Sequence, residues 1–149
     1  MTTFAYTETF AFPASAVFAL LTDLEARASW IAGILEVRVT PQGPARPGTS
    51  YFEAGKFSGY KSEKTMSVTE FEQDRLLTLN TAPEASSPFR ESYRIEPLSP
   101  TSCRVQFTVE VGNVPKVAEF FMQQQMKKTQ PQQAARLKEL LASQNQQAG

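Results

Sequence analysis

The order of patterns between Phe4 and Trp30 constrains the fold of this chain more than any other feature. The segment Phe4–Phe12 places aromatic side chains at nearly every second position, which is typical of a strand with one buried face. Pro13 follows, and a proline suits the first turn of a helix, where its missing N–H costs nothing. Apolar residues at helical spacing continue to about Thr22. The sequence therefore predicts a strand that leads directly into a short amphipathic helix.

Length and charge limit the classes of protein to which the chain can belong. Its 149 residues predict one domain, and 15 basic against 15 acidic residues leave no basic excess for a nucleic-acid partner. No apolar run approaches the roughly 18 residues needed to cross a bilayer, and the first residues lack the pattern of a signal peptide. One cysteine excludes an internal disulfide. We therefore expect a cytoplasmic protein without stable membrane insertion.

The chain contains no histidine. This excludes Ser-His-Asp and Cys-His catalysis, histidine general bases and every metal site that needs histidine. Metal sites rich in cysteine are excluded too, because only one thiol is present. We therefore expect no metal and no cofactor, and an enzyme built on this chain would use Asp, Glu, Tyr, Lys or Arg.

The middle of the chain predicts a second short helix and a series of strands. Asp23 is the predicted N-cap of a helix over Leu24–Ser29. The predicted strands are Ile34–Thr40, Thr49–Lys56, Tyr60–Phe71, Leu76–Thr81, Phe89–Glu96 and Cys103–Val111. Most of the connections between them are short, which favours an antiparallel meander over parallel crossovers. A bulge is expected near Thr69–Phe71, where strict alternation of apolar residues fails.

The last third of the sequence predicts a long helix from about Lys116 towards Ala142. Pro131 lies inside it, so we expect a kink or break near Lys127–Gln130. The predicted domain covers residues 1–142, and residues 143–149 are expected to form a disordered tail.

Several segments of the chain resemble one superfamily. They are the run Phe10–Asp23 followed by Trp30, the loop that ends in Pro47-Gly48, the segment Val68–Phe71, and Tyr93–Pro97. The chain resembles the START/Bet v 1-like (SRPBCC) superfamily, and within it the polyketide cyclase/dehydrase and lipid-transport group. The resemblance implies an α+β helix-grip fold of order β-α-α-β6-α. In this fold a curved seven-stranded antiparallel sheet, with two short helices, wraps around a long C-terminal helix and leaves a hydrophobic cavity between them.

Three charged residues interrupt apolar strand faces: Glu53, Lys64 and Glu91. A charge in such a row costs several kcal/mol unless it is paired or reaches water. They either face a solvated cavity and orient a ligand, or lie where a strand leaves the core, or form a structural Glu–Lys pair. The structural interpretation is favoured for Glu53 and Lys64. The two interpretations are balanced for Glu91, because Phe89 and Tyr93 flank it on the same face.

The predicted ligand-binding residues come from the short helices, the inner strand faces and the long helix. They are Trp30, Tyr51, Tyr60, Met66, Leu79, Glu91, Tyr93, Phe107, Phe120, Phe121 and Gln124. Each class also has an ordinary structural role: a core plug for the tryptophan, sheet packing for the tyrosines, and a solvated helix face for the glutamines. Cys103 is expected to be a small buried hydrophobe, and Arg90, Arg94 and Arg104 are expected on the outer face of the sheet.

Three hypotheses about function follow. The first is binding of a hydrophobic or aromatic small molecule, lipid- or polyketide-like, in the cavity. The second is a polyketide cyclase, aromatase or dehydratase with Glu91 as base and Tyr93 as acid. The third is a protein-interaction module with a filled core and an exposed apolar patch. A homodimer is compatible with all three, since an uncovered edge strand needs protection.

Overall fold

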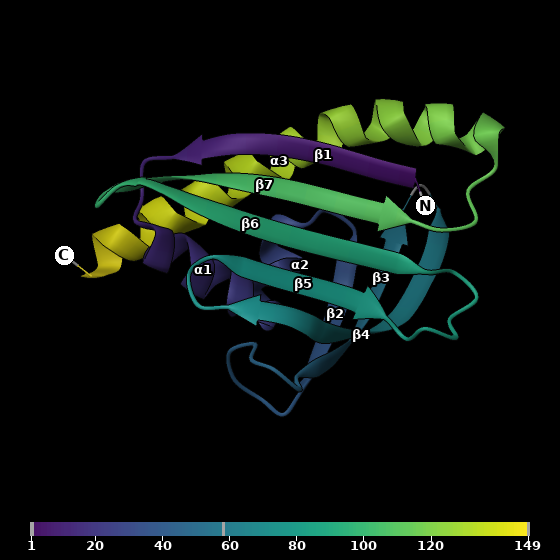
Figure 1. Cartoon of the computed structure of the whole chain (residues 1–149), viewed down its shortest axis with the longest axis horizontal. Helices are drawn as coiled ribbons and strands as arrows, with labels where there is room; N and C mark the ends of the chain where they lie inside the picture. The colour runs from purple at the N-terminus through teal and green to yellow at the C-terminus, as the bar shows by residue number, and fades with distance from the viewer. Residues whose placement is uncertain (1, 58, 149) are drawn as a thin grey trace.

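The computed structural model describes residues 2–57 and 59–148, and it describes the side chains of all of these residues except 57, 60 and 145–148. Within the described residues, seven strands form one antiparallel sheet (Figure 1). The strand order is β1-β7-β6-β5-β4-β3-β2. The strands are β1 Thr2–Phe10, β2 Ile34–Thr40, β3 Ser50–Phe57, β4 Tyr60–Glu72, β5 Leu76–Thr81, β6 Phe89–Ser99 and β7 Ser102–Val111. The helices are α1 Ala14–Thr22, the 3-10 turn η1 Leu24–Ala26, α2 Arg27–Trp30 and α3 Lys116–Ala148. The predicted helix-grip architecture is confirmed.

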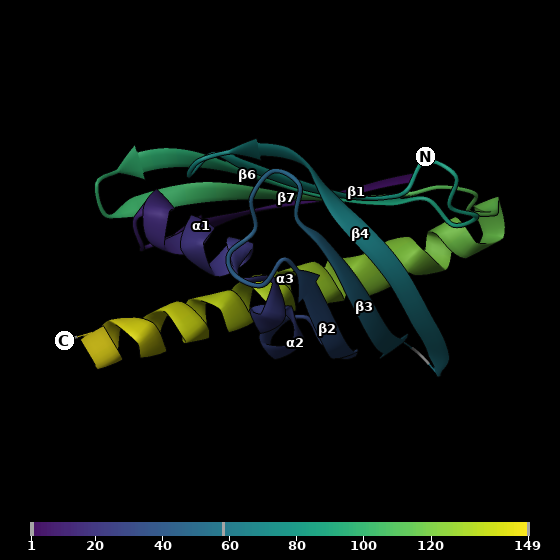
Figure 2. The same cartoon turned by 90° about the horizontal axis from the view of Figure 1, so that it is seen from below.

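The sheet curls around one side of α3, as the rotated view makes plain (Figure 2). Strands β2 to β7 pair with their neighbours in sequence, and β1 pairs with β7 along its whole length. The pairing of β4 with β5 shifts between Val68 and Glu70, so the predicted bulge is confirmed. A bulge re-aims the side chains that follow it, and Phe71 here contacts Phe18 of α1, with ring centroids 5.4 Å apart.

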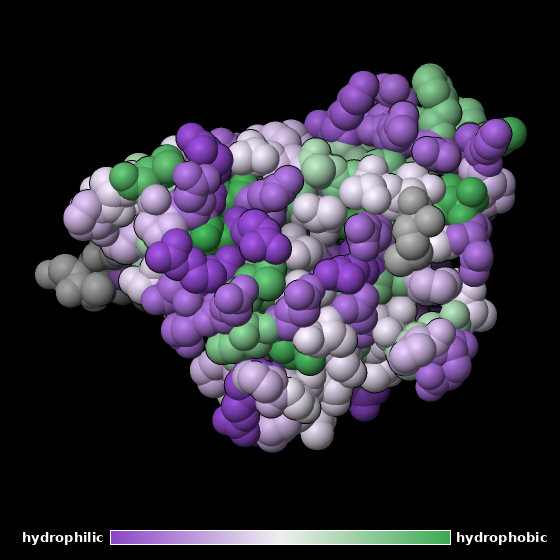
Figure 3. Space-filling model, viewed as in Figure 1, coloured by the Kyte–Doolittle hydropathy of each residue, from purple (hydrophilic) through white to green (hydrophobic). Residues whose placement is uncertain are grey.

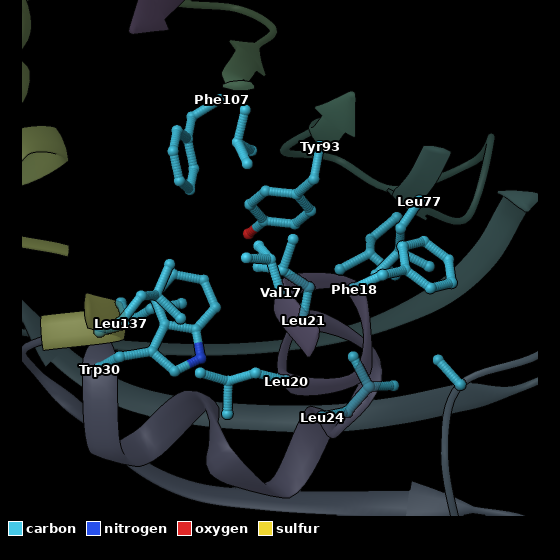
Figure 4. Packing of buried hydrophobic residues seen from close by; sticks show 14 of the residues in the cluster. Val17, Phe18, Leu20, Leu21, Leu24, Trp30, Leu77, Tyr93, Phe107 and Leu137 are labelled. Carbon is cyan, nitrogen blue, oxygen red and sulfur yellow. The ribbon is translucent and has the colours of Figure 1, made fainter. Parts of the chain in front are cut away.

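The short helices pack their apolar residues against the sheet. Val17, Phe18 and Leu21 of α1 are buried beside Leu77 and Tyr93 (Figure 4). Pro13 is the N-cap of α1, immediately before the first helical residue.

The predicted second short helix is a 3-10 turn followed by one turn of α-helix, and the side chain of Asp23 makes no capping hydrogen bond. Asp23 is therefore the N-cap residue of η1 by position, as predicted, but it does not cap the turn through its side chain. The compact turn buries both Arg27 and Trp30.

The long helix α3 continues past Pro131 without interruption and reaches Ala148. Of the predicted kink or break, the break does not occur, and α3 includes residues 143–148, for which a disordered tail was expected; Gly149 lies outside the described residues. The helix does change direction between its green and yellow parts (Figure 1). A proline removes one helical hydrogen bond, and the burial of Ala134, Leu137 and Leu141 on the C-terminal side holds the helix together.

Candidate functional site

A cavity of about 1030 Å³ lies between the concave side of the sheet and α3. Its wall on the sheet side includes Phe4, Glu53, Lys64, Phe89, Glu91, Tyr93, Phe107 and Val109, and Trp30 closes it from α2. Helix α3 contributes Met122, Gln125, Met126, Thr129, Gln130 and Gln133. Exposed residues of the β5–β6 loop, among them Ala82 and Ser86, border the cavity. The cavity therefore has a wall of both apolar and polar side chains and reaches the molecular surface.

A buried arginine organises the polar groups of this cavity. Arg27 is only 1% exposed, and its Nη2 donates to Glu91 Oε2 at 2.7 Å and to both carboxylate oxygens of Glu53 at 3.4 Å. Its Nη1 donates to the hydroxyl of Tyr93 at 3.1 Å, and that hydroxyl donates to Glu91 Oε2 at 2.6 Å. We call Arg27, Glu53, Glu91 and Tyr93 the Arg27 cluster. It joins α2 to β3 and β6.

Aromatic rings enclose the guanidinium group. The Cζ atom of Arg27 lies 5.5 Å from the ring centroid of Tyr51 and 5.7 Å from that of Trp30. Tyr93 makes edge contacts with Trp30 at 6.1 Å and with Phe107 at 5.7 Å between centroids. A cation is attracted to the faces of such rings, most strongly where water is excluded. The rings therefore help to hold Arg27 charged in the interior.

The two carboxylates of the Arg27 cluster have opposite pKa shifts. Burial by itself would raise the pKa of Glu91, but the charges of Arg27 and Lys64 and the hydrogen bonds from Tyr93 and Arg27 outweigh burial and lower it. Burial raises the pKa of Glu53, because its longer contacts with Arg27 and the nearby charge of Glu91 leave its own charge less compensated. Burial and the neighbouring Glu91 also raise the pKa of Tyr93, which keeps the phenol protonated.

Lys64 stands opposite Glu53 in the sheet, yet the two do not form an ion pair among the described side chains. The Nζ of Lys64 lies 3.6 Å from the ring centroid of Phe89, and Glu53 pairs with Arg27. The predicted Glu–Lys pair was therefore wrong. The reason is that Arg27 of α2, which lies outside the sheet, provides the counter-charge for Glu53.

The structure divides the predicted ligand-binding residues into four groups. Trp30, Glu91, Tyr93 and Phe107 line the cavity. Tyr51, Met66 and Leu79 are buried in the core and lie outside that lining. Phe120, Phe121 and Gln124 lie outside it on the exposed side of α3. The side chain of Tyr60 lies outside the described residues.

The assignment of Phe120, Phe121 and Gln124 to the cavity wall was wrong because the first half of α3 has two apolar sides. The cavity side is Met122, Gln125, Met126 and Thr129, at the spacing of one helix face. The other side exposes 60% of Phe120 and 68% of Phe121. Apolar surface is visible where α3 begins (Figure 3). Helical periodicity finds both stripes but does not say which one meets the sheet.

Sequence reasoning did not single out Arg27. The signal that could have found it was the pair of glutamates on inner strand faces, since buried carboxylates require a counter-charge. Cys103 is buried as predicted, and Arg90 and Arg104 lie on the outer face, where Arg90 pairs with Glu70 at 2.6 Å.

Among residues 2–57 and 59–148, no group of three or more acidic, cysteine or histidine side chains could hold a metal ion. Over the same part of the chain, no helix has the length and apolar character needed to cross a bilayer.

Comparisons with solved structures place the chain among helix-grip proteins. A START superfamily protein from Mycobacterium smegmatis superposes with a TM-score of 0.75 at 15% identity, covering 95% of this chain and 97% of that one. The Zhui aromatase/cyclase from Streptomyces sp. R1128 gives 0.67 at 12% identity, covering 95% and 92%. Human STARD10 gives 0.70 at 13% identity, covering 94% of this chain and 63% of that one. These identities show a shared fold.

Family assignment rests on a match over nearly the whole sequence. No match was found among curated proteins. The model of the family described as polyketide cyclase / dehydrase and lipid transport matches residues 1–142. The chain therefore belongs to the polyketide cyclase/dehydrase and lipid transport family, as its resemblance predicted.

Proposed function

We propose that this protein binds a hydrophobic or aromatic small molecule, lipid- or polyketide-like, in the cavity between the sheet and α3. The observation that carries the proposal is the cavity of about 1030 Å³. Pockets for small organic ligands and cofactors typically enclose roughly 300–1,000 Å³ behind mostly apolar walls. A container of this size holds a molecule of several fused rings or a long acyl chain.

The composition of the wall supports the same class of ligand. Phe107, Val109, Met122 and Met126 offer apolar surface, and the buried carboxylates of the wall, Glu53 and Glu91, belong to the Arg27 cluster. Methionine fills irregular spaces and adapts to different ligand shapes. The family description, which covers both polyketide chemistry and lipid transport, agrees with an apolar ligand.

Native mass spectrometry of protein purified gently from its own host tests the proposal on the unmodified chain. We expect extra mass that disappears on denaturation. A fluorescence titration with the apolar probe N-phenyl-1-naphthylamine gives an independent test with variants. Val109→Trp places an indole ring in the cavity and should weaken probe binding, whereas Val117→Trp, the same change on the exposed side of α3, should leave it intact. Equal binding by both variants would contradict the proposal.

A second candidate function is catalysis on a polyketide-like substrate, favoured by the contact between Glu91 and Tyr93 at the cavity wall. The lowered pKa keeps Glu91 ionised as a base, and the raised pKa keeps Tyr93 protonated as an acid. Incubation with an aromatic poly-ketone and product analysis by mass spectrometry tests this role. A Glu91→Gln variant that folds and retains full turnover would eliminate the assignment.

The third hypothesis, an interaction module with a filled core, fits less well. A filled core leaves no space of the size found between the sheet and α3. The exposed Phe120 and Phe121 remain available for contacts with other molecules.

A further inference from the structure

The carboxylates of the Arg27 cluster retain hydrogen-bond acceptors on the cavity side. Both short bonds to Glu91 reach Oε2, from Arg27 at 2.7 Å and from Tyr93 at 2.6 Å. Among the described residues, Glu91 Oε1 accepts no hydrogen bond, and Glu53 receives only the two 3.4 Å contacts from Arg27 Nη2. A carboxylate has about four acceptor positions. Both glutamates line the cavity, so a ligand can reach the unused positions.

The donors of the cluster point away from the ligand space. Arg27 lies behind the cavity wall rather than in its lining, and its Nη atoms bond Glu53, Glu91 and Tyr93. The hydroxyl of Tyr93 donates to Glu91. The side of the cluster that faces the cavity is therefore rich in acceptors.

The charges of the cluster do not balance. One arginine stands against two carboxylates, and all three side chains are at most 10% exposed. Lys64 also lines the cavity, but its ammonium lies over Phe89 and makes no ion pair with either glutamate among the described side chains. Within the described part of the chain, Glu53 has only the two 3.4 Å contacts from Arg27 to compensate its charge, and burial raises its pKa. A donor placed beside Glu53 would relieve that cost.

We propose that the ligand carries a hydrogen-bond-donating head, a hydroxyl group or a protonated amine, which binds between Glu53 and Glu91. Both carboxylates contact the same nitrogen of Arg27, so one head group can reach both. The apolar body lies against Phe107, Met122 and Met126. An anionic head is rejected, because it would enter beside two buried carboxylates. This inference rests on the proposed function, and it narrows the class of ligand.

Isothermal titration of the full chain with four naphthalene probes of one shape tests the inference. The probes are 2-naphthol, 2-naphthylmethylamine, 2-methoxynaphthalene and 2-naphthoate. We expect the hydroxyl and the amine to bind about tenfold more tightly than the methoxy compound, since a bond to a charged acceptor is worth about a factor of ten or more. The carboxylate should bind most weakly. The comparison between hydroxyl and amine shows whether the site selects a donor or a cation.

Two variants test whether the preference for a hydrogen-bond-donating head depends on the Arg27 cluster. Glu53→Gln removes one charge at constant shape and should reduce the preference for amine over methoxy about tenfold. Glu72→Gln, a matched change at an exposed position outside the cavity, should leave it unchanged. If Glu53→Gln does not fold, Lys64→Met provides the complementary test, because loss of that positive charge should increase amine affinity.

The outcomes separate the two proposals. Binding of all four probes with equal affinity, or strongest binding of 2-naphthoate, overturns the donor-head inference and leaves the ligand cavity in place. If none of the four probes and no N-phenyl-1-naphthylamine binds, the cavity is not a ligand site, and both proposals are overturned.

Discussion

At the scale of single residues, the burial of Arg27 depends on its interaction partners, because a charged guanidinium group by itself favours water. Transfer of a guanidinium group out of water costs several kcal/mol, and only well-placed counter-charges offset that cost. Arg27 has two carboxylates, one phenol and two aromatic rings around it. Removal of the arginine would leave two negative charges together in the interior. The stability of the fold should therefore be sensitive to substitution of any one member of the Arg27 cluster.

Replacing Arg27 with methionine should lower the free energy of unfolding by about 3–5 kcal/mol, the usual cost of breaking a buried ion pair from one side. Urea denaturation measures this difference. Arg38→Met is the control, because Arg38 pairs with Glu36 at 2.9 Å on the surface, where the side chains are 67% and 51% exposed. That change should cost about 0.5 kcal/mol or less. Similar costs for the two variants would contradict the role assigned to Arg27.

The opposite pKa shifts of Glu91 and Glu53 predict opposite effects of pH. The pKa of Glu91 is lowered in the folded state, so its stabilising contribution is present above the unfolded pKa and is lost as pH falls. The pKa of Glu53 is raised, so its contribution is present below the unfolded pKa and is lost as pH rises. Glu91→Gln should therefore be more destabilising at about pH 8 than at about pH 4. Glu53→Gln should show the reverse.

Urea denaturation of both variants and the parent chain at the two pH values measures these differences. Each variant serves as the control of the other, since both replace a carboxylate by an amide of the same shape. Differences that change in the same direction with pH would contradict the assigned shifts.

At the scale of elements, α3 performs two tasks along its length. Its first half covers the cavity through Met122 and Met126. Its second half packs into the core through Ala134, Leu137 and Leu141, and Trp30 lies beside Leu137 (Figure 4). The small side chain of Ala134 is completely buried, which indicates that the helix approaches its neighbours closely there. The position of the whole helix depends on this close contact.

Ala134→Leu should destabilise the fold by about 1–3 kcal/mol, because a buried position without space must distort to accept three more carbon atoms. Ala135→Leu is the matched control, because Ala135 is exposed and leucine is a good helix former. Thermal unfolding followed by circular dichroism compares them. Equal melting temperatures would show that α3 is not tightly packed at Ala134.

At the scale of the whole molecule, the same sheet supplies both a packed core and an open container. The core gathers around α1, α2 and the second half of α3, and the cavity lies under the first half of α3. Side chains that line an empty space lose dispersion contacts on that side. A ligand that fills the space restores them and binds the folded state alone. Ligand binding should therefore stabilise the fold.

A ligand at about 100 times its dissociation constant should contribute about 2.7 kcal/mol, which raises Tm by about 5–10 °C for a domain of this size. Differential scanning fluorimetry with the tightest-binding naphthalene probe measures the shift. The Val109→Trp variant, which narrows the cavity, should show a clearly smaller shift with the same probe. A similar shift in that variant would place the binding site outside the cavity.

The sequence by itself determined the order of elements, the antiparallel meander and the bulge near Glu70, because periods of 2 and 3.6 and turn residues act locally. It also placed Glu91 and Tyr93 on an inner face. Only the tertiary structure decided the partner of Glu53, the side of α3 that faces the cavity, and the passage of the helix through Pro131. These depend on contacts between residues far apart in the chain, as with Arg27 and Glu91. Local preference cannot specify them, since their energy arises only when separate elements pack together.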